Sequence, residues 1–542
     1  MTLRGDESDL VIRGGTIYDG RGGPPIEGDV AVSGDRIAGI GGVAGRSRVE
    51  LDAGGLAVAP GFVNMLSWAT ESLIADGRAQ SDVRQGVTLE VMGEGSSMGP
   101  LNEAMKEGLA AQSLIDLDVE WTTLGEYLDH LVRRGVTPNV ASFVGAATVR
   151  EHELGAVDRP PSPAELRRMQ GLVADAMEEG AVGVSSALVY APGFYAATDE
   201  LVALARVAAE HGGMYISHLR SEGNAWLEAV DELLTIAREA GVRSEIYHLK
   251  ASGRSNWDKL DAVVERVERA RAGGLAVTAD MYPYTAGATG LNGAMPPWVQ
   301  EGGFDVWRER LSQPEVRARV EREMTTETDE WENMFLLAGP ENMRLLAFKS
   351  DRLRPLTGKT LAQVAEERGT SPAQAAMDLV VEDESGVSTA YFTMSEENVR
   401  RGLALPWVSF CSDSWAPAAE GIFLQFSTHP RAYGAFARLL GRYVRDERVL
   451  RLEEAIRRLT ALPAANLRLA DRGRLEPGCF ADLVVFDPAR IEDHATYDDP
   501  HRYASGVLHV AVNGTLVVRD GEHTGALPGR VVRGPGAGCS TS

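Results

Sequence analysis

Short runs of apolar residues recur along the middle of the chain, and each is bounded by polar or glycine-rich segments. Runs of this length predict buried strands, and longer stretches with helical periodicity lie between several of them. Strands that alternate with helices in this way are typical of parallel βαβ units. The predicted strands cover residues 56–66, 87–92, 139–145, 181–187, 214–218, 244–249, 275–281 and 407–412.

Helix-start signals support the helices between these strands. Ser162, Pro163 and Glu165 predict a helix with a serine N-cap and a returning glutamate. Thr198 predicts the cap of a second helix, and residues 224–240 and 256–272 predict two more. Eight such units with parallel strands form a (β/α)8 barrel, which is the predicted α/β fold. A doubly wound sheet is the rival, but no GxGxxG follows the first strand.

Both ends of the chain show a different pattern, with short alternating runs and glycine-rich turns. We therefore predict a small β-sandwich domain formed by residues 1–60 and 465–535, with a catalytic barrel over 61–464 and a tail at 536–542. Residues 291–398 are too many for an ordinary connection and predict an inserted subdomain. This insertion is either a lid over the barrel mouth or an exposed helical decoration.

The charge balance narrows the classes of partner. The chain has 54 Lys and Arg against 78 Asp and Glu, a formal net charge of −24. Such a surface repels nucleic acid and anionic membrane, so we expect neither of those partners, and a surface tuned for solubility is the favoured interpretation of the charge. Three scattered cysteines, a charged start and no long apolar run favour a cytoplasmic protein. The oligomeric state stays open, and a homo-oligomer is among the alternatives.

Two histidines end neighbouring predicted strands, His218 in MYISH and His248 in SEIYHL. In a (β/α)8 barrel the strand ends converge at one face, so both rings could bind one metal ion. Asp413 ends the last strand and could activate water; the alternative is a helix N-cap. A lone strand-end histidine is more often a satisfied polar residue, but this pair occupies equivalent positions. His152 and His429 lie in predicted loops and stay in reserve.

Several segments together carry a family resemblance. They are PGFVN at 60–64, GVSSALVYAPGFYAATDEL at 183–201, ISHLRSEG at 216–223, YHLKASG at 247–253, DMYPYTAG at 280–287, THPRAYG at 428–434 and ADLVVFDP at 481–488. The chain resembles the N-acyl-D-amino-acid deacylases, or D-aminoacylases, of the amidohydrolase superfamily, and the resemblance covers nearly its whole length. It implies zinc bound by His218 and His248, with Asp413 as the catalytic aspartate.

The resemblance also implies that three residues contact the substrate. Lys250 would offer an ammonium to a free carboxylate, and Tyr190 would donate to the reacting carbonyl. Tyr282 matches a further substrate-contacting residue. Without the motifs around them, Lys250 would be read as a surface lysine and Tyr190 as a packing residue.

The chain departs from the family at the first two strands. The first strand continues as Asn64-Met65-Leu66-Ser67-Trp68, where the family has an HxH pair, so we predict no second metal site there. After the second strand, Gly95 stands where the family has a cysteine ligand. Glu94 is the predicted substitute, in a His2Glu zinc site. The alternative is that Glu94 faces solvent in a glycine-rich turn.

The resemblance implies a small-molecule substrate, and the predicted activity is hydrolysis of the C–N amide bond of an N-acyl-(D-)amino acid or a similar small amide. In the favoured mechanism one zinc lowers the pKa of water, and Asp413 removes its proton and later protonates the leaving amine. In a second mechanism metal binding is lost or weakened, and the barrel acts on an easier bond. A cyclic amide or imide hydrolase and a catalytically silent binding barrel are the alternative functions.

Overall fold

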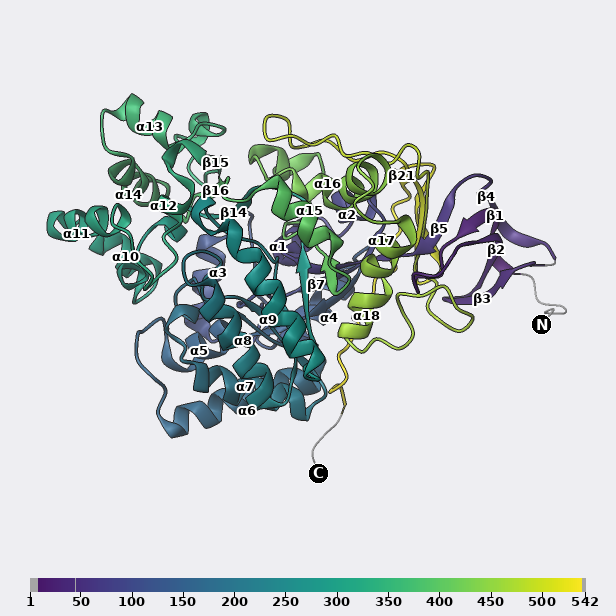
Figure 1. Ribbon diagram of the computed structural model, residues 1–542, viewed down its shortest axis with the longest axis horizontal. Helices are drawn as coiled ribbons and strands as arrows, with labels where there is room; N and C mark the ends of the chain where they lie inside the picture. The colour runs from purple at the N-terminus through teal and green to yellow at the C-terminus, as the bar shows by residue number, and fades with distance from the viewer. Residues whose placement is uncertain (1–7, 44, 539–542) are drawn as a thin grey trace.

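The computed structural model of the protein describes residues 8–43 and 45–538 (Figure 1). Part of the predicted tail, residues 539–542, lies outside the described residues, and so does the start of the chain up to residue 7. No described helix is long and apolar enough to cross a membrane.

Parallel strands form a barrel in the middle of the molecule. Hydrogen-bonded neighbours form two series, β6-β7-β8 and β9-β10-β11-β12-β13-β17. β8 and β9 are consecutive in the chain, and together they take the place of the third strand of the barrel. A parallel bridge between Ser67 and Ser414 links the two ends of the barrel sheet. The predicted (β/α)8 fold is therefore confirmed. The strands are β6 (Phe62–Ser67), β7 (Val87–Met92), β8 (Asn139–Ser142), β9 (Val144–Gly145), β10 (Gly183–Ala187), β11 (Met214–His218), β12 (Arg243–Ile246), β13 (Val277–Met281) and β17 (Val408–Phe410).

The first predicted strand is in fact two strands that belong to different sheets. β5 (Ala57–Pro60) pairs antiparallel with β18 (Leu483–Phe486) in the β domain, whereas β6 belongs to the barrel. Gly61 separates them, and a Cβ at Gly61 would lie 2.2 Å from Oγ1 of Thr88. The chain therefore passes from one sheet to the other through a point where no side chain fits.

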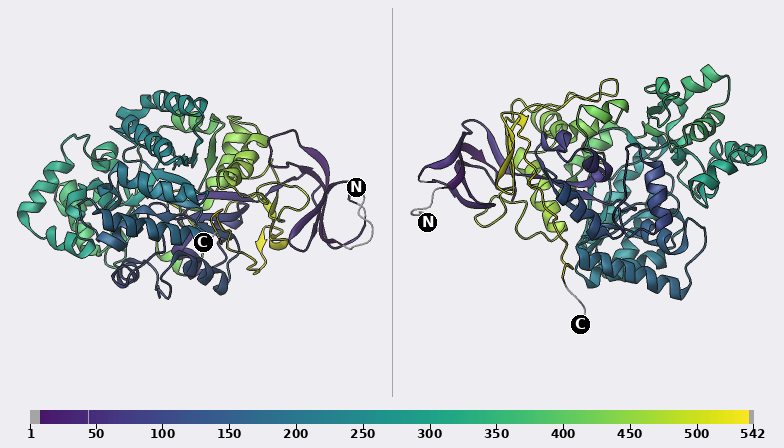
Figure 2. Two further views of the ribbon diagram at one scale, coloured as in Figure 1. Left: turned by 90° about the horizontal axis from the view of Figure 1, so that it is seen from below. Right: turned by 180° about the vertical axis from the view of Figure 1, so that it is seen from behind.

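Both chain ends contribute to one nine-stranded sheet, in the order β21-β20-β19-β18-β5-β1-β2-β3 with β4 beside β1. This sheet lies at the opposite end of the molecule from the insertion (Figure 1; Figure 2). The prediction that the two ends build one β domain is confirmed. Its remaining strands are β1 (Ser8–Ile17), β2 (Ile26–Ser33), β3 (Arg36–Gly41), β4 (Ser47–Asp52), β19 (Val507–Val512), β20 (Thr515–Arg519) and β21 (Glu522–His523).

The predicted helix signals are partly confirmed. Ser162 caps α6 in a full capping box with Glu165, but α7 begins at Thr198 itself, whose hydroxyl donates to Glu232 instead of capping. The helices predicted from 224 and 256 begin later, because a turn and a 3-10 helix precede them. The helices near the barrel are α1 (Ala69–Ala75), α2 (Gln80–Val83), α3 (Glu103–Gln112), α4 (Leu124–Arg134), α5 (Ala146–Leu154), α6 (Pro163–Glu179), α7 (Thr198–Glu210), α8 (Trp226–Ala240), α9 (Leu260–Ala272), α16 (Arg431–Arg438), α17 (Leu452–Leu459) and α18 (Ala461–Asn466).

The segment between β13 and β17 forms a compact unit at one end of the molecule (Figure 1). A three-stranded antiparallel sheet in the order β14-β16-β15 supports it, and its apolar side chains form a separate buried cluster around Trp307 and Phe348. Its elements are β14 (Gly287–Gly290), α10 (Phe304–Arg310), α11 (Pro314–Met324), α12 (Met334–Ala338), β15 (Met343–Ala347), α13 (Leu361–Arg368), α14 (Pro372–Asp383) and β16 (Ser388–Tyr391). The segment also contains α15 (Glu396–Ala404), which lies outside this unit and packs against the barrel core through Val399 and Leu403 (Figure 1).

Candidate active site

A cavity of about 660 Å³ opens at the C-terminal ends of the barrel strands. Residues that follow β6, β7, β11, β12 and β17 line its floor, and the insertion supplies part of its wall through Met334, Ser388 and Tyr391. The insertion therefore does more than decorate the surface, because it encloses the space above the strand ends. This is the face of a (β/α)8 barrel at which active sites lie.

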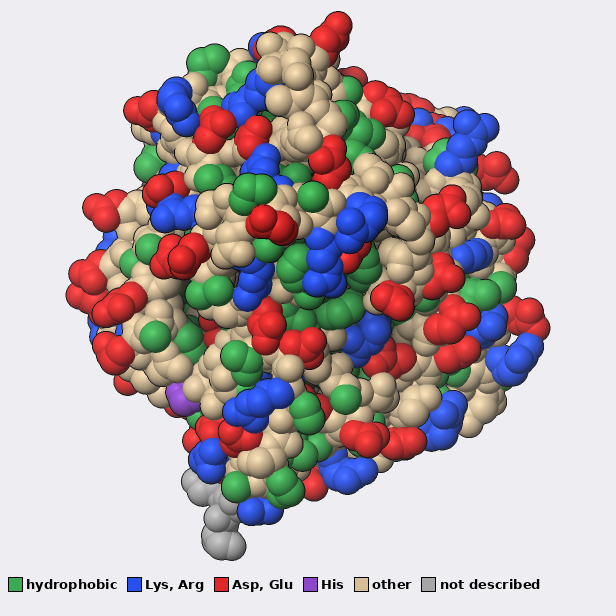
Figure 3. All heavy atoms as spheres, turned by 90° about the vertical axis from the view of Figure 1, so that its left-hand side faces the viewer, with side chains coloured by type: hydrophobic (Ala, Val, Ile, Leu, Met, Phe, Trp, Pro, Cys, Tyr) green, Lys and Arg blue, Asp and Glu red, His purple; other side chains and the backbone are tan. Residues whose placement is uncertain are grey.

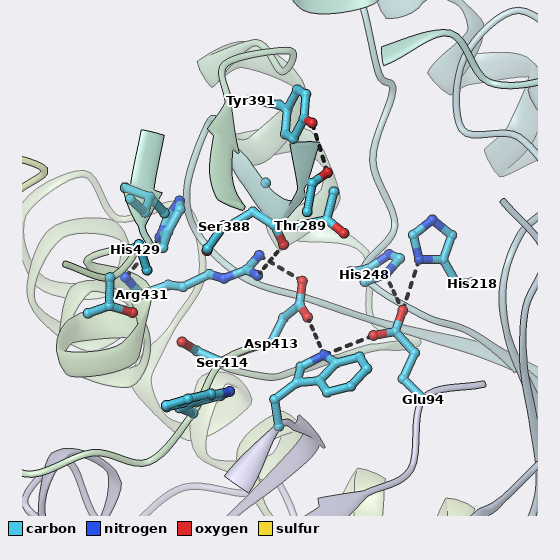
Figure 4. A pocket seen from close by; sticks show the side chains of 18 of the residues that line it. Glu94, His218, His248, Thr289, Ser388, Tyr391, Asp413, Ser414, His429 and Arg431 are labelled. Carbon is cyan, nitrogen blue, oxygen red and sulfur yellow. Dashed lines mark hydrogen bonds and ion pairs between the residues drawn. The ribbon is translucent and has the colours of Figure 1, made fainter. Parts of the chain in front are cut away.

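Three potential metal ligands meet at the bottom of this cavity (Figure 4). Oε1 of Glu94 lies 2.9 Å from Nδ1 of His218 and 2.9 Å from Nε2 of His248. The ligand atoms all lie within 4.8 Å of one another, and all three side chains are buried. In the described part of the chain this is the only such group of three or more histidines, cysteines and acids. Glu94 therefore points into the barrel rather than towards solvent.

Two of the three groups have protonation states that suit zinc. Burial alone would raise the pKa of Glu94, but His248 and His218 hold it below its ordinary range, so the carboxylate is ionised. Burial lowers the pKa of His218, which keeps that ring neutral. The third is His248: burial and Lys250 would lower its pKa, but Glu222 and Glu94 raise it to about 10, so this ring must release a proton when a metal binds. A carboxylate and imidazole nitrogens form one of the ligand sets that catalytic zinc takes in proteins.

Glu222 lies on the side of the His248 ring opposite to Glu94. Its carboxylate lies 2.9 Å from Nδ1 of His248 and 2.7 Å from Nζ of Lys250. A carboxylate on the second nitrogen of a ligand histidine sets the orientation of the ring. The backbone of His248 has a φ of 35°, and its N–H donates to Asp280 at 2.7 Å. Such a left-handed residue is uncommon outside glycine and is often found at functional sites.

Asp413 faces this group from the end of β17 (Figure 4). Its Oδ2 lies 2.7 Å from Nη1 of Arg431, and its Oδ1 accepts a hydrogen bond of 3.2 Å from the indole N–H of Trp68. Its backbone φ is 49°, so it shares the left-handed conformation of His248. Burial raises the pKa of Asp413, and Arg431 partly offsets this effect. Asp413 therefore does not act as a helix N-cap.

The three predicted substrate-contacting residues all line the cavity. The ring of Tyr190 packs edge-on against His218, with centroids 5.3 Å apart. The hydroxyl of Tyr282 is buried and has no hydrogen-bond partner among the described residues. Lys250 lies 6.0 Å from the centre of the Tyr282 ring. Their roles in binding remain predictions.

A sequence profile of the amidohydrolase family matches residues 49–518. The chain belongs to the amidohydrolase family. N-acyl-D-glutamate deacylase of Alcaligenes xylosoxydans xylosoxydans is 34% identical to it over 529 residues, which cover 97% of each chain.

Two solved structures place this amidohydrolase in the branch that contains the D-aminoacylases. The zinc- and phosphonate-bound N-acyl-D-glutamate deacylase of Bordetella bronchiseptica superimposes with a TM-score of 0.80 at 32% identity, over 97% of this chain and 100% of that one. A D-aminoacylase described as having a binuclear metal centre, with one-metal activation and second-metal attenuation, gives 0.81 at 32% identity over the same shares.

The first strand of this amidohydrolase contributes no residue to the described metal-ligand group. The amide of Asn64 instead donates to Asp82 at 3.0 Å and to Glu90 at 2.9 Å inside the barrel. Leu66 is fully buried among apolar side chains.

Sequence reasoning missed several residues that line the cavity. Glu222 stands four positions after His218 within ISHLRSEG, and Arg431 lies within THPRAYG, so both were visible in motifs already noted. His429, held in reserve, also lines the cavity, where its ring bonds to the Ala286 carbonyl at 3.0 Å. Trp68 was noted only as a residue that is not histidine, although an indole N–H is also a strong donor.

Proposed function

We propose that this amidohydrolase cleaves the amide bond of N-acyl-D-amino acids with the help of one zinc ion. The observation that carries the proposal is the meeting of Glu94, His218 and His248 in a cavity opposite Asp413. A relative that shares 34% identity over 97% of the chain is an N-acyl-D-glutamate deacylase, which supports the same reaction class and substrate configuration.

The zinc ligands in this proposal are Glu94, His218 and His248. Bound zinc supplies a Lewis acid that lowers the pKa of water toward about 7 and polarises a carbonyl group. Glu222 holds His248 in place through the 2.9 Å contact with Nδ1, and it leaves the other ring nitrogen directed at Glu94. Oε1 of Glu94 faces the two histidines, and Oε2 accepts a hydrogen bond from the indole N–H of Trp68.

Asp413 moves the proton. Its carboxylate accepts a proton from the attacking water as the water oxygen bonds to the acyl carbon. It then gives this proton to the amine nitrogen as the C–N bond breaks, which releases a carboxylic acid and a free amino acid. Burial raises the pKa of Asp413 above its ordinary value, and this shift makes the return of the proton easier.

The remaining polar groups orient the substrate. Lys250 and Arg431 are the cationic side chains among the described residues that line the cavity, and both would attract the α-carboxylate. The free hydroxyl of Tyr282 lies beside them. Burial raises the pKa of Tyr190 well above its ordinary value, so its hydroxyl stays protonated and donates to the carbonyl oxygen.

The side chain of the substrate is expected to be neutral. Both cations already face a carboxylate of the protein, since Lys250 pairs with Glu222 and Arg431 with Asp413. The described lining holds no further lysine or arginine, whereas it includes Met334, Leu346, Phe423 and Phe426. A second substrate carboxylate would therefore lie in this cavity without a partner, at a cost in binding free energy.

Zinc content and turnover of His248→Ala test the proposal. We expect the purified wild type to hold zinc and to hydrolyse N-acetyl-D-methionine faster than N-acetyl-D-glutamate or the L isomers. His248→Ala should lose both the metal and the activity, because a two-ligand site holds zinc weakly. His494→Ala, which removes an exposed imidazole bonded only to Ser505 in the β domain, is the matched control.

The outcomes separate the alternatives. A wild type without zinc, even after zinc is supplied, would favour a silent binding barrel. Turnover of hydantoins but not of N-acyl amino acids would favour a cyclic amide hydrolase. Full metal retention in His248→Ala would remove His248 from the ligand set.

A further inference from the structure

The indole of Trp68 lies between two buried carboxylates of the site. Its N–H donates to Oε2 of Glu94 at 3.0 Å and to Oδ1 of Asp413 at 3.2 Å. Trp68 directly follows β6, and its backbone N–H donates to the carbonyl of Ser414 at 2.9 Å, which ties this position to the end of the last barrel strand. Hydrogen bonds of the backbone N–H and of the indole N–H therefore both fix the position of the Trp68 ring.

The carboxylates of Glu94 and Asp413 lie 3.0 and 3.2 Å from the same indole nitrogen. Two ionised carboxylates that are so close together in a buried site repel each other. Proteins commonly relieve such repulsion with a cation that bridges the two groups. Here the polar hydrogen of the indole occupies the bridging position. Indole has a donor and no lone pair to offer, so Trp68 cannot itself bind a metal ion.

Both carboxylate oxygens of Asp413 already have a partner. Its Oδ1 accepts from Trp68 and its Oδ2 lies 2.7 Å from the guanidinium of Arg431. Glu94 is divided in the same way, with Oε1 facing the two histidines and Oε2 facing Trp68. A second cation between Glu94 and Asp413 would have to displace the indole.

We propose that Trp68 replaces a second metal ion: its N–H joins Glu94 to Asp413, limits the site to one zinc and aims the Asp413 carboxylate at the reacting water. This inference rests on the proposed zinc-dependent hydrolysis. Trp68 is a positioning residue, because it acts through Glu94 and Asp413. Because Trp68 excludes a second metal ion, excess zinc should not change the activity of the enzyme.

Three variants test this role: Trp68→Phe, Trp68→His and Trp298→Phe. Trp68→Phe removes the N–H and keeps a ring of similar shape. Trp298→Phe is the matched control, because the Trp298 indole also donates to a carboxylate, Glu323 at 2.6 Å, but lies outside the cavity in the insertion. Trp68→His replaces the donor with a side chain that can bind metal. Calorimetric titration of the chelator-treated proteins with zinc counts the sites, and steady-state kinetics separates kcat from KM.

We expect one zinc site in the wild type, Trp68→Phe and Trp298→Phe, and a second, weaker site in Trp68→His. In Trp68→Phe, kcat should fall about tenfold or more while KM changes by less than about twofold, because the hydrogen bonds of the indole to Glu94 and Asp413 are lost while Lys250 stays in place. Trp298→Phe should keep the wild-type kcat. Zinc in large excess should leave wild-type kcat unchanged and should lower that of Trp68→His.

Different results overturn different claims. A wild type that binds no zinc would overturn the proposed function and this inference with it. One zinc in the wild type together with an unchanged kcat in Trp68→Phe would overturn the positioning role alone. Two zinc sites in the wild type, or only one in Trp68→His, would overturn the replacement of a second metal ion by Trp68.

Discussion

The role proposed for Asp413 depends on the groups that contact it. The indole N–H of Trp68 donates to one of its oxygens, the guanidinium of Arg431 forms an ion pair with the other, and burial raises its pKa. A carboxylate fixed in this way has one orientation and is ready to accept and return a proton. Its backbone is left-handed, with a φ of 49°, and its carboxylate lies between the indole of Trp68 and the guanidinium of Arg431.

Replacing Asp413 by asparagine should separate catalysis from metal binding. We expect Asp413→Asn to keep its zinc, because Asp413 is not one of the three proposed ligands, and to lose about 10²–10⁴-fold in kcat, the usual contribution of a general acid–base group. Metal analysis and steady-state kinetics on the same preparation measure both effects. Asp493→Asn, which breaks an aspartate–arginine pair outside the cavity, is the control. Turnover at the wild-type rate in Asp413→Asn would remove this residue from the mechanism.

At the level of elements, the boundary between β5 and β6 joins the two sheets. β5 extends the β domain through β18, and one residue later β6 begins the barrel and ends next to Trp68. Gly61 lies at the crossing, where the side chain of Thr88 fills the space a Cβ would need. The position of the first strand end in the active site therefore depends on close packing at this glycine.

Gly61→Ala should destabilise the protein. The added methyl group would lie 2.2 Å from Oγ1 and 2.7 Å from Cβ of Thr88, so the strands must move apart. Overpacking of this kind costs about 1–3 kcal/mol in the free energy of unfolding. The matched control is Gly171→Ala on α6, where no atom lies within 4 Å and helix propensity favours alanine. Thermal unfolding should show a lower midpoint for Gly61→Ala only, and equal midpoints would disprove the packing argument.

At the scale of the whole molecule, acidic groups dominate the surface and the cavity. The formal net charge is −24, and the face on the side of the insertion shows acidic and basic side chains around a central hydrophobic area (Figure 3). The proposed substrate is an anion, so the long-range field of the protein opposes its approach. Lys250 and Arg431 attract it only at short range, because each is paired with a carboxylate.

Added salt should therefore increase the rate of productive encounter. We expect kcat/KM for an N-acyl-D-amino acid to rise as ionic strength increases from about 10 to 150 mM, because screening weakens repulsion over distances beyond about 10 Å. The value of kcat should stay constant. Sucrose at equal osmolality, which leaves the charges unscreened, is the control. A fall in kcat/KM with salt would mean that the local field of Lys250 and Arg431 dominates the approach.

The alternation of strands and helices was sufficient to predict the barrel, and strand ends were sufficient to select His218, His248 and Asp413 as candidates. Both features are local in sequence, since hydrophobic periodicity and the last residue of a strand depend on near neighbours. Local pattern failed at Gly61, where one apolar run serves two sheets. The pattern there continues unbroken, and only the packing against Thr88 divides it.

The identity of the three meeting side chains and their surroundings required the tertiary structure. Glu94 was an uncertain substitute in sequence, and only the folded barrel brings its carboxylate within 2.9 Å of both histidines. The contacts of Trp68 with Asp413 and of Glu222 with Lys250 join residues on separate loops. Sequence by itself determined which residue types stand at the strand ends. The tertiary structure decided which of them touch, because loop conformations depend on contacts between distant parts of the chain.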